Sequence, residues 1–267
     1  MSLAAGGARL AFARGPQRTD LVAAAARSPT RLLTPRNHGH ARWVYTSSFG
    51  GGLVSGDEAR YDLDVGAGAT AVLLTQASTK VYRSPRPASQ TVRATVGAGA
   101  CLAILPDPVV CFAGARFCAD ASIRLGEGAS LVWLEVLGAG RVARGERWAF
   151  DSYASRLRVE QGGALLAHEA TELDDRAGPL GSRFGAMNLV GTLLVAGPAG
   201  ETLGPDLRAA STTPRRGASV VAQASTRDGV TVLRFAAERT EDGQRLVARA
   251  LAALPPLLGD DPFARRA

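Results

Sequence analysis

The sequence predicts a mainly β protein, with stacked β-strands in a two-layer, β-helix-like or solenoid-like body and about two helices, one of them near the C-terminus. The first observation behind this prediction is a phrase of strand, glycine turn and strand that recurs through the middle of the chain. The second is composition: 31 of the 267 residues are glycine and only 6% are aromatic, which favours tight turns and small-residue packing. The third is that the two strands of each phrase differ in polarity, as two layers require.

The turn of this phrase has the pattern Gly-x-Gly-Ala. Copies begin at Gly66, Gly97 and Gly126, and a looser copy contains Gly162. These glycines lie 31, 29 and 36 residues apart. A repeat of this length indicates a stacked or solenoid-like arrangement, and its uneven spacing argues against a perfect solenoid.

The strands on either side of each turn have different patterns. In Thr91–Val96, before a turn, apolar and polar residues alternate, which places them on opposite faces of a strand. In Leu102–Leu105, after the turn, every residue is apolar, which predicts burial on both faces between two sheets. We therefore expect the alternating strands to form the outer layer.

Three short strands are predicted before the repeats, over Asp20–Arg27, Arg31–Thr34 and Ala41–Ser47. The alternative for Leu21–Arg27 is a short helix, because alanine is the best helix former. The nearby Pro29 favours the strand.

After the repeats, Met187–Ala196 predicts another buried strand. The stretch Gly197–Gly217 is rich in proline, glycine and arginine, which predicts a mobile surface connector. Strands are predicted over Val220–Ser225 and Val230–Phe235, and the Asp-Gly pair at 228–229 predicts a hairpin between them.

The best helix is predicted over Glu241–Leu254, whose leucines, valine and alanines recur at helical spacing. Thr240 or Asp242 can cap its start, and the two prolines at 255–256 are expected to end it. No linker divides the chain clearly, so residues 1–267 are predicted to form one domain.

Charge and composition limit the functions that the chain can have. The net charge of +7 suggests an acidic partner, either nucleic acid or an acidic protein. The arginines are scattered and no nucleic-acid-binding motif accompanies them, so no nucleic-acid partner is expected. The N-terminus does not resemble a secretory signal, no stretch of 18 apolar residues occurs, and the three cysteines form no CxxC pair. We expect a cytoplasmic protein without a membrane span.

The glycine cluster Gly50–Asp57 has the glycine spacing of a phosphate-binding loop. Such a loop requires lysine at the position where this chain has Asp57, and an anionic side chain there repels phosphate. The cluster is better interpreted as a glycine turn that lets two strands pack closely.

No residue pattern indicates a permanent metal site or a catalytic centre. His38 and His40 are weak metal candidates without a third ligand nearby, and Cys111 and Cys118 are interpreted as buried small hydrophobic residues. Serine nucleophile motifs are absent, so the chain is not expected to be an enzyme. Glu135 directly follows an apolar strand, so it can pair with an arginine such as Arg141 or face a channel. The alternative is a strand-end carboxylate in contact with water.

Lys80 is the single lysine, and the other 30 basic residues are arginines. Lysine carries a compact, mobile charge and arginine a rigid planar fork. This one exception among so many arginines is either due to chance or makes Lys80 a candidate for a position where arginine is a poor substitute.

Several separated motifs resemble, in one order, those of the urease accessory protein UreD (UreH) family. The most distinctive is Thr75–Ser84 (TQASTKVYRS), preceded by Gly51–Asp57 (GGLVSGD). Further similar stretches are the early strand Ser28–Pro35, the proline-rich Leu105–Phe117, Trp133–Glu135, Gly140–Arg141 and Gly145–Phe150. The resemblance is dense over residues 20–160 and looser elsewhere. Departures are Gly50, Ser55, Cys111 and the tail after Leu254.

The resemblance implies a non-enzymatic maturation factor with a β-rich fold of stacked strands and two helices. Such proteins bind apo-urease together with a UreF-type partner and a UreG-type GTPase, and they help to deliver nickel to the urease active site. Nickel is then a cargo in transit, with no cofactor tightly bound. A cargo metal that must leave is expected to meet few, weak oxygen ligands, and not a closed histidine and cysteine site.

The resemblance also implies site residues. Those that fall on positions of a proposed nickel route are Asp57, Thr79, Lys80, Glu135 and Glu169. Those that belong to the family motifs or to partner contacts are Gly51, Gly52, Gly56, Gln76, Tyr82, Arg83, Pro106, Pro108, Arg141 and Glu146. On this hypothesis Asp57 and Glu135 guide Ni²⁺ weakly, and Lys80 holds a carboxylate in place.

Two alternatives remain open on the sequence. A basic nucleic-acid-binding β protein explains the charge and predicts salt-sensitive binding to random DNA. A carbohydrate hydrolase on a β-solenoid requires two close carboxylates across a groove.

Overall fold

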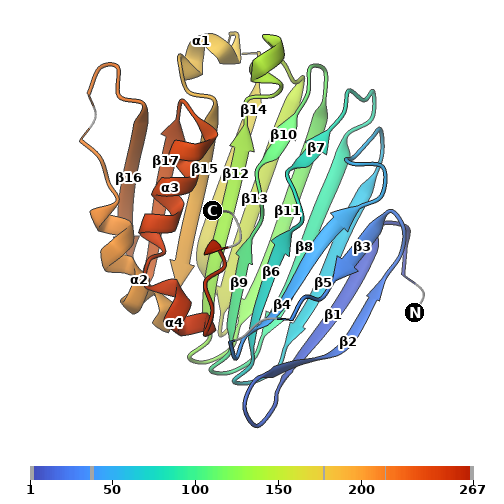
Figure 1. Cartoon of the computed structure of the whole chain (residues 1–267), viewed down its shortest axis with the longest axis vertical. Coiled ribbons are helices and arrows are strands. Elements are labelled where there is room, and N and C mark those ends of the chain that lie inside the picture. Colours follow the sequence, from blue (N-terminus) through green and yellow to red (C-terminus); the bar gives the residue numbers. More distant parts are fainter. Residues whose placement is uncertain (1–2, 37–38, 177, 214, 265–267) are drawn as a thin grey trace.

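A computed structural model describes residues 3–36, 39–176, 178–213 and 215–264. The chain forms two β-sheets, which we call sheet 1 and sheet 2 (Figure 1). Sheet 1 has the strand order β14 (Ala164–Asp174), β13 (Ser152–Gln161), β11 (Arg116–Leu125), β8 (Ala88–Val96), β5 (Glu58–Val65), β1 (Gly7–Arg14), β2 (Thr19–Ala26). Sheet 2 has the order β16 (Val220–Arg227), β17 (Val230–Ala237), β15 (Leu189–Ala196), β12 (Ser130–Gly138), β9 (Cys101–Leu105), β6 (Thr70–Thr75), β4 (Arg42–Ser48), β3 (Thr30–Leu33). The short strand β10 (Val109–Cys111) joins β12 to β7 (Thr79–Val81).

The predicted repeat sets the strand register. The glycine turns at Gly66, Gly97 and Gly126 each connect a strand of sheet 1 to one of sheet 2, and equivalent strands of successive repeats pair in parallel. The looser copy at Gly162 instead joins β13 to its antiparallel neighbour β14 within sheet 1. In sheet 1, Val65 lies opposite Val96, Val96 opposite Leu125, and Leu125 opposite Gln161. The two residues of each pair lie as far apart in the sequence as the corresponding turn glycines do. Each repeat therefore adds one strand to sheet 1. The mainly β, two-sheet prediction is confirmed.

The turn glycines meet two separate backbone requirements. A Cβ atom on Gly97 or Gly126 would lie 2.6 Å or 2.8 Å from a backbone nitrogen of the preceding turn, so the first glycine permits close stacking. The second glycine of the turn, Gly99 or Gly128, has φ of +63°, a left-handed conformation that side chains disfavour.

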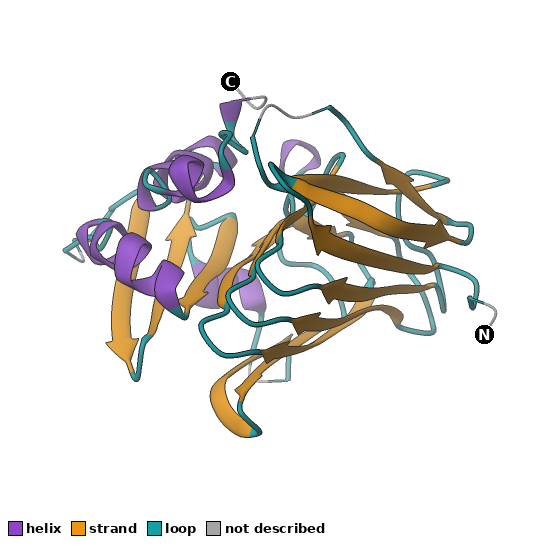
Figure 2. Cartoon of the chain, turned by 90° about the horizontal axis from the view of Figure 1, so that it is seen from below, coloured by secondary structure: helices purple, strands orange, loops and turns teal. Residues whose placement is uncertain are grey.

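Sheet 2 is buried on both faces, but only one face packs on a sheet. Leu102 and Ile104 of β9 lie in the core between the sheets, while Ala103 and Leu105 lie in a second core with the helices. The prediction that these apolar strands lie between two sheets is therefore wrong for one face. Helices α2 (Pro198–Ala209) and α3 (Thr240–Ala250) cover β15 and β17 there, and Figure 2 shows the helices gathered on one side.

Two predictions about the helices are also wrong. Gly197–Gly217 was expected to be a connector, but α2 forms there, because Pro198 suits the first turn of a helix and Leu203 and Leu207 are buried four residues apart. The prolines at 255–256 were expected only to end a helix, but they lie at the start of α4 (Leu254–Leu258). With α1 (Leu180–Phe184), the described residues form four α-helices where about two were expected, two of them only five residues long.

The flanking strands follow the sequence prediction. The stretches predicted around residues 20–27, 31–34 and 41–47 form β2, β3 and β4, so the helical alternative for the first is wrong. Strands β16 and β17 form the predicted hairpin, with Asp228 and Gly229 both at positive φ as the tight turn requires. No helix in the described ranges is long and apolar enough to span a membrane.

Candidate functional site

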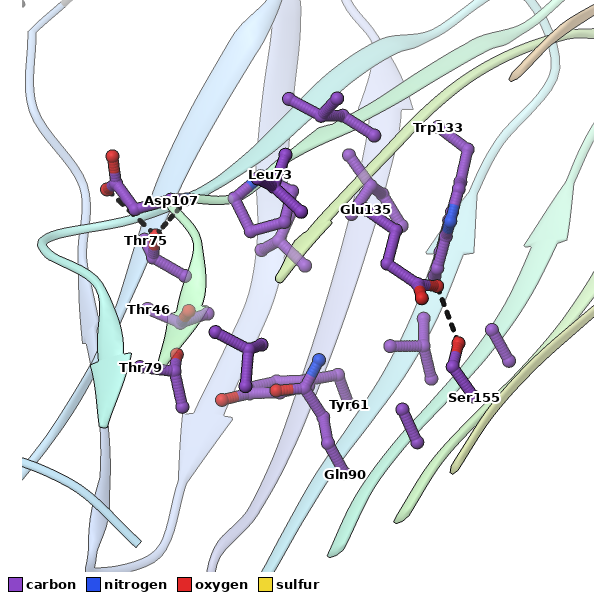
Figure 3. A pocket seen from close by; sticks show the side chains of 18 of the residues that line it. Thr46, Tyr61, Leu73, Thr75, Thr79, Gln90, Asp107, Trp133, Glu135 and Ser155 are labelled. Carbon is purple, nitrogen blue, oxygen red and sulfur yellow. Dashed lines mark hydrogen bonds between the residues drawn. The ribbon is translucent and has the colours of Figure 1, made fainter. Parts of the chain in front are cut away.

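The space between the sheets contains a small cavity of about 60 Å³, which we call the inner cavity. Both sheets and the segment between β9 and β10 contribute to its wall (Figure 3). Its hydroxyl, amide and carboxyl side chains are Thr46, Tyr61, Thr75, Thr79, Gln90, Asp107, Asp120, Glu135, Tyr153 and Ser155. Apolar side chains such as Leu73, Ile104 and Trp133 separate these oxygen atoms, Arg156 also lines the cavity, and the described lining includes no histidine or cysteine.

A second cavity of about 150 Å³ adjoins the first, and we call it the outer cavity. The two share five lining residues: Thr46, Tyr61, Thr75, Thr79 and Gln90. The outer cavity adds Gly51, Gly52, Gln76 and Lys80, all from the two most distinctive sequence motifs. Together the two cavities form what we call the inter-sheet passage, which runs from these motifs toward Glu135.

Glu135 lies at the inner end of this passage. Residues alternate along β12, so Trp133 and Glu135 face sheet 1 while Leu134 and Val136 face the helices. Tyr153 donates a hydrogen bond to Oε1 at 2.9 Å. Ser155 donates one to Oε2 at 2.6 Å (Figure 3). Of the expectations for Glu135, pairing with Arg141 is wrong, because Arg141 pairs with Glu146. Glu135 lines the inner cavity, and a channel at this position stays a prediction.

The surroundings of Glu135 disfavour its charged form. Burial raises the pKa of the Glu135 carboxyl above its ordinary value, the hydroxyls of Ser155 and Tyr153 lower it, and the negative charge of Glu169 raises it. Burial also raises the pKa of the Tyr153 hydroxyl, and the charge of Glu135 adds to this effect. A bound cation would offset the burial of the Glu135 carboxylate and the repulsion from Glu169, so this carboxylate is suited to a transient positive ligand.

A second carboxylate, Asp107, lines the inner cavity. Thr75 donates a hydrogen bond from Oγ1 to Asp107 Oδ2 at 2.9 Å and accepts one from the Asp107 backbone at 2.7 Å. The prolines predicted as motif residues flank it, and the carbonyl of Pro108 accepts a hydrogen bond from the Thr79 backbone at 3.1 Å. Pro106 lines the inner cavity, so this segment positions Thr75, Thr79 and Asp107 together.

Asp57, in contrast, does not line the passage. Its Oδ2 accepts a hydrogen bond from the Val54 backbone at 2.8 Å, and its own N–H donates to the Val54 carbonyl at 3.0 Å. Asp57 thus closes the turn over residues 54–57, which contains Gly56 and follows Gly51 and Gly52. The segment before this turn packs on β7, because Leu53 donates a backbone hydrogen bond to Lys80 at 2.8 Å. Close packing of two segments was the preferred interpretation of this glycine cluster, and it is confirmed.

Three of the predicted motif residues form one chain of contacts at the edge of the sheets. Tyr82 packs edge-on against Phe112 with ring centroids 5.2 Å apart, and the Arg141 guanidinium lies 4.5 Å from the centre of the same ring. Arg141 donates from Nε to Glu146 at 3.0 Å, which lowers the pKa of Glu146. Glu146 also accepts a hydrogen bond from the Ala113 backbone at 2.9 Å. These contacts join three loop segments, which follow β7, β10 and β12.

The remaining motif residues lie near this cluster and the glycine turn. Arg83 is exposed and packs over Gly114, where a Cβ atom would lie 3.0 Å from its side chain. Gly56 has φ of +76° and lies against the Arg86 guanidinium. Gln76 is exposed at the outer cavity.

Glu169 lies on the edge strand of sheet 1 and forms an ion pair with Arg234 of sheet 2. It lines neither cavity of the passage, but its charge acts on Glu135. The structure therefore brings Thr79, Lys80 and Glu135 to the passage and leaves Glu169 outside its lining.

The weak metal candidates do not form a site in the described residues. His38 lies outside them. The Nε2 atom of His40 lies 3.0 Å from the Leu257 carbonyl, and this contact joins the chain's N-terminal part to α4. No group of three histidine, cysteine or acidic side chains able to hold a metal occurs in the described ranges. Cys111 is buried as expected, but Cys118 is exposed, because it lies on the outward face of β11.

Comparison with known proteins gives the family. The family model described as UreD urease accessory protein matches residues 4–267. The chain belongs to this family. A urease accessory protein UreD of Sorangium cellulosum (strain So ce56) is 49% identical over 263 residues, 98% of this chain and 84% of that protein. A UreD of Anaeromyxobacter sp. (strain Fw109-5) is 45% identical over 270 residues, 99% of this chain and 91% of that protein.

In this UreD-family chain, the sequence reasoning missed Tyr153, Ser155, Asp107 and Arg234. Tyr153 and Ser155 alternate on β13 with exposed residues, so the period of two could have placed them on an inward face. Asp107 stands within the recognised proline motif. Arg234 had no sequence signal, because its partner is 65 residues away on another sheet.

Proposed function

We propose that this chain is a non-enzymatic maturation factor that binds apo-urease in the cytoplasm, together with a UreF-type protein and a UreG-type GTPase. In that assembly it assists the GTP-dependent insertion of nickel into the urease active site. Its membership of the UreD urease accessory protein family supports this proposal. The net charge of +7 fits acidic protein partners, and family membership favours this role over nucleic-acid binding or carbohydrate hydrolysis.

We further propose that nickel crosses the chain by the inter-sheet passage. The observation that carries this proposal is Glu135, a carboxylate held by Tyr153 and Ser155 at the inner end of a cavity lined with oxygen donors. Carboxylate and hydroxyl oxygens bind Ni²⁺ more weakly than imidazole or thiolate does, so they suit a cargo that must be released. Thr79 and Lys80 line the entry, and Asp57 acts through the turn that it closes.

The test is Glu135→Gln, which keeps the size and hydrogen-bonding capacity of the side chain and removes its charge. The variant is co-expressed with the urease subunits and both partner proteins, and urease activity and nickel content are measured. We expect most of the activation to be lost while apo-urease and the partners still co-purify with the variant. Glu127→Gln, in an exposed repeat turn, is the matched control and should activate urease normally. Normal activation by Glu135→Gln in an intact complex would contradict the route.

A further inference from the structure

Residues 49–57 join β4 to β5, and we call them the β4–β5 loop. This loop exposes two large apolar side chains: Phe49 is 59% exposed and Val54 is 52% exposed. Five large hydrophobic side chains are exposed among the described residues, and no other loop carries two of them. Apolar area that is concentrated on one short loop indicates a contact surface, whereas single exposed residues do not.

Backbone hydrogen bonds hold this loop at both ends and in the middle. The Phe49 N–H donates to the Pro29 carbonyl at 2.9 Å, and Leu53 bonds to β7 in both directions, at 2.8 Å and 2.9 Å. Asp57 closes the turn that begins at Val54. Both apolar side chains therefore project from a fixed backbone, so little conformational entropy is lost when a partner covers them.

Three basic residues from other segments adjoin the loop: Arg31, Lys80 and Arg86. The Arg31 guanidinium carbon lies 5.7 Å from the centre of the Phe49 ring, and an added Cβ atom on Gly56 would lie 3.0 Å from the Arg86 guanidinium. All three basic residues are exposed, and none forms an ion pair with another described residue. The loop is therefore flanked by positive charges that the chain itself does not neutralise.

The apolar side chains also lie next to the outer cavity in the chain. Phe49 directly follows Ser48, and Val54 directly follows Leu53; both preceding residues line that cavity, as do residues 51–52 between them. A partner that covers Phe49 and Val54 therefore sits beside the outer cavity.

The chemistry of this surface indicates a protein partner. A rigidly presented aromatic side chain fits an apolar pocket, and exposed cations beside it fit carboxylates at the border of that pocket. An anionic membrane is disfavoured, because Asp57 belongs to the same loop and the exposed Glu58 follows it, and both carboxylates are repelled by acidic lipid.

We propose that the β4–β5 loop is a docking surface for one protein of the maturation assembly, whose own surface offers an apolar pocket bordered by carboxylates. Phe49 and Val54 fill this pocket, and Arg31, Lys80 and Arg86 contact its acidic border. This inference rests on the proposed function and adds to it the surface by which the chain is held in the assembly. The partner then lies at the end of the passage that carries the two distinctive motifs.

The test compares assembly by loop variants and matched controls. The tagged full-length chain is co-expressed with the urease subunits and both partner proteins, and the amount of each protein that co-purifies is measured. Phe49→Ser should lower the amount of at least one of them about tenfold, and Val54→Ser about threefold. The controls are Val22→Ser, 62% exposed, and Leu165→Ser, 52% exposed, and both should assemble like the wild type.

A second pair of variants tests the charges. Arg31→Glu places a carboxylate beside Phe49 and should lower co-purification of the same protein about tenfold. Arg93, which is exposed on the outward face of β8 and forms no ion pair with another described residue, is the control, and Arg93→Glu should assemble normally. Thermal unfolding followed by circular dichroism should give the same midpoint for the loop variants and the controls, because every substituted side chain is exposed.

Three results would overturn the docking surface. The first is equal assembly by Phe49→Ser and Val22→Ser. The second is a dimer of the wild-type chain alone, in sedimentation, that Phe49→Ser makes monomeric, because a second copy then covers the loop. The third is binding to phosphatidylglycerol vesicles that Phe49→Ser abolishes, because the loop then contacts a membrane.

This proposal and the proposed function fail in different ways. If the wild-type chain assembles and activates urease but the loop variants do so equally well, only the docking surface is wrong. If the wild-type chain neither retains these proteins nor activates urease, the proposed function is wrong and the docking surface falls with it. Glu135→Gln is expected to lose activation with its assembly intact, whereas Phe49→Ser is expected to lose assembly itself.

Discussion

Carboxylates in this chain serve different purposes that their immediate partners define. Glu135 accepts hydrogen bonds from two neutral hydroxyls beside a cavity, and no ion pair with a cationic side chain is found for it among the described residues. Asp57 accepts a backbone N–H within its own turn, and Glu146 is neutralised by Arg141. A charge without a cationic partner in a partly dehydrated site attracts a cation, whereas a paired one stabilises the fold. Glu135 is therefore the residue on which the proposed transport depends most.

Lys80 is the residue at which we expect arginine to be a poor substitute. Its side chain is exposed beside the outer cavity, and its backbone carbonyl holds Leu53. Arginine is bulkier than lysine and binds a carboxylate with two parallel hydrogen bonds, which would narrow this entry and hold an acidic group too tightly. We expect Lys80→Arg to fold normally and to lower urease activation in the co-expression assay. Activation at the wild-type level would show that the charge alone is sufficient.

The element that links the two distinctive motifs is the glycine turn against β7. The Leu53 backbone bonds to Lys80, the Tyr82 backbone bonds to Leu53, and Leu53 is buried. The turn therefore behaves as an added short strand alongside β7 and forms one wall of the outer cavity. Close approach of the two backbones is possible only where a side chain is missing.

Gly52→Ala should disrupt this packing. The added Cβ atom would lie 2.6 Å from the Lys80 carbonyl oxygen and 2.7 Å from the Tyr82 ring. We expect the free energy of unfolding to fall by about 1–3 kcal/mol, as for other overpacked sites, in denaturant titrations followed by circular dichroism. Gly51→Ala is the informative comparison, because nothing lies within 4 Å of its Cβ position. Because no atom is crowded there, only the strain of a side chain at φ of +73° remains, and it should lower the free energy of unfolding by about 1 kcal/mol. A smaller loss for Gly52→Ala than for Gly51→Ala would contradict this account.

At the scale of the whole molecule, the last helix, α4, is joined to the segment that leads into β4 of sheet 2. The carbonyls of Leu257 and Leu258 in α4 contact His40 Nε2 at 3.0 Å and the Ala41 N–H at 3.1 Å. Leu254 and Leu258 share a core with Trp43 of β4. The last helix therefore covers an early strand of sheet 2, and it stabilises the sheet that carries Glu135.

Replacing Leu258 tests this closure. Leu258 is fully buried, so Leu258→Ala should lower the free energy of unfolding by about 2–5 kcal/mol. Leu165, on the edge strand β14, is 52% exposed, and Leu165→Ala should change that free energy by less than about 0.5 kcal/mol. Thermal and denaturant unfolding of both variants, followed by tryptophan fluorescence, measures the difference. Equal losses for the two leucines would mean that α4 does not cover the core.

The sequence by itself determined the layers, their register and the family. Turn glycines and alternating side chains are local signals, so the spacings of 31 and 29 residues reappear as parallel strand pairs. The motifs also located Glu135 and the stretch Thr75–Ser84. Helix α2 was not foreseen, because its short pattern of buried leucines is decided by docking onto sheet 2.

Only the tertiary structure decided which side chains meet across the two sheets. Glu135 meets Tyr153 and Ser155 from another sheet, and Glu169 meets Arg234 over 65 residues of sequence. Such contacts depend on how two sheets face one another, and neither alternation nor turn spacing carries that information. For the same reason Asp57, equal to Glu135 as a sequence candidate, proved to be engaged within its own turn while Glu135 faces the passage.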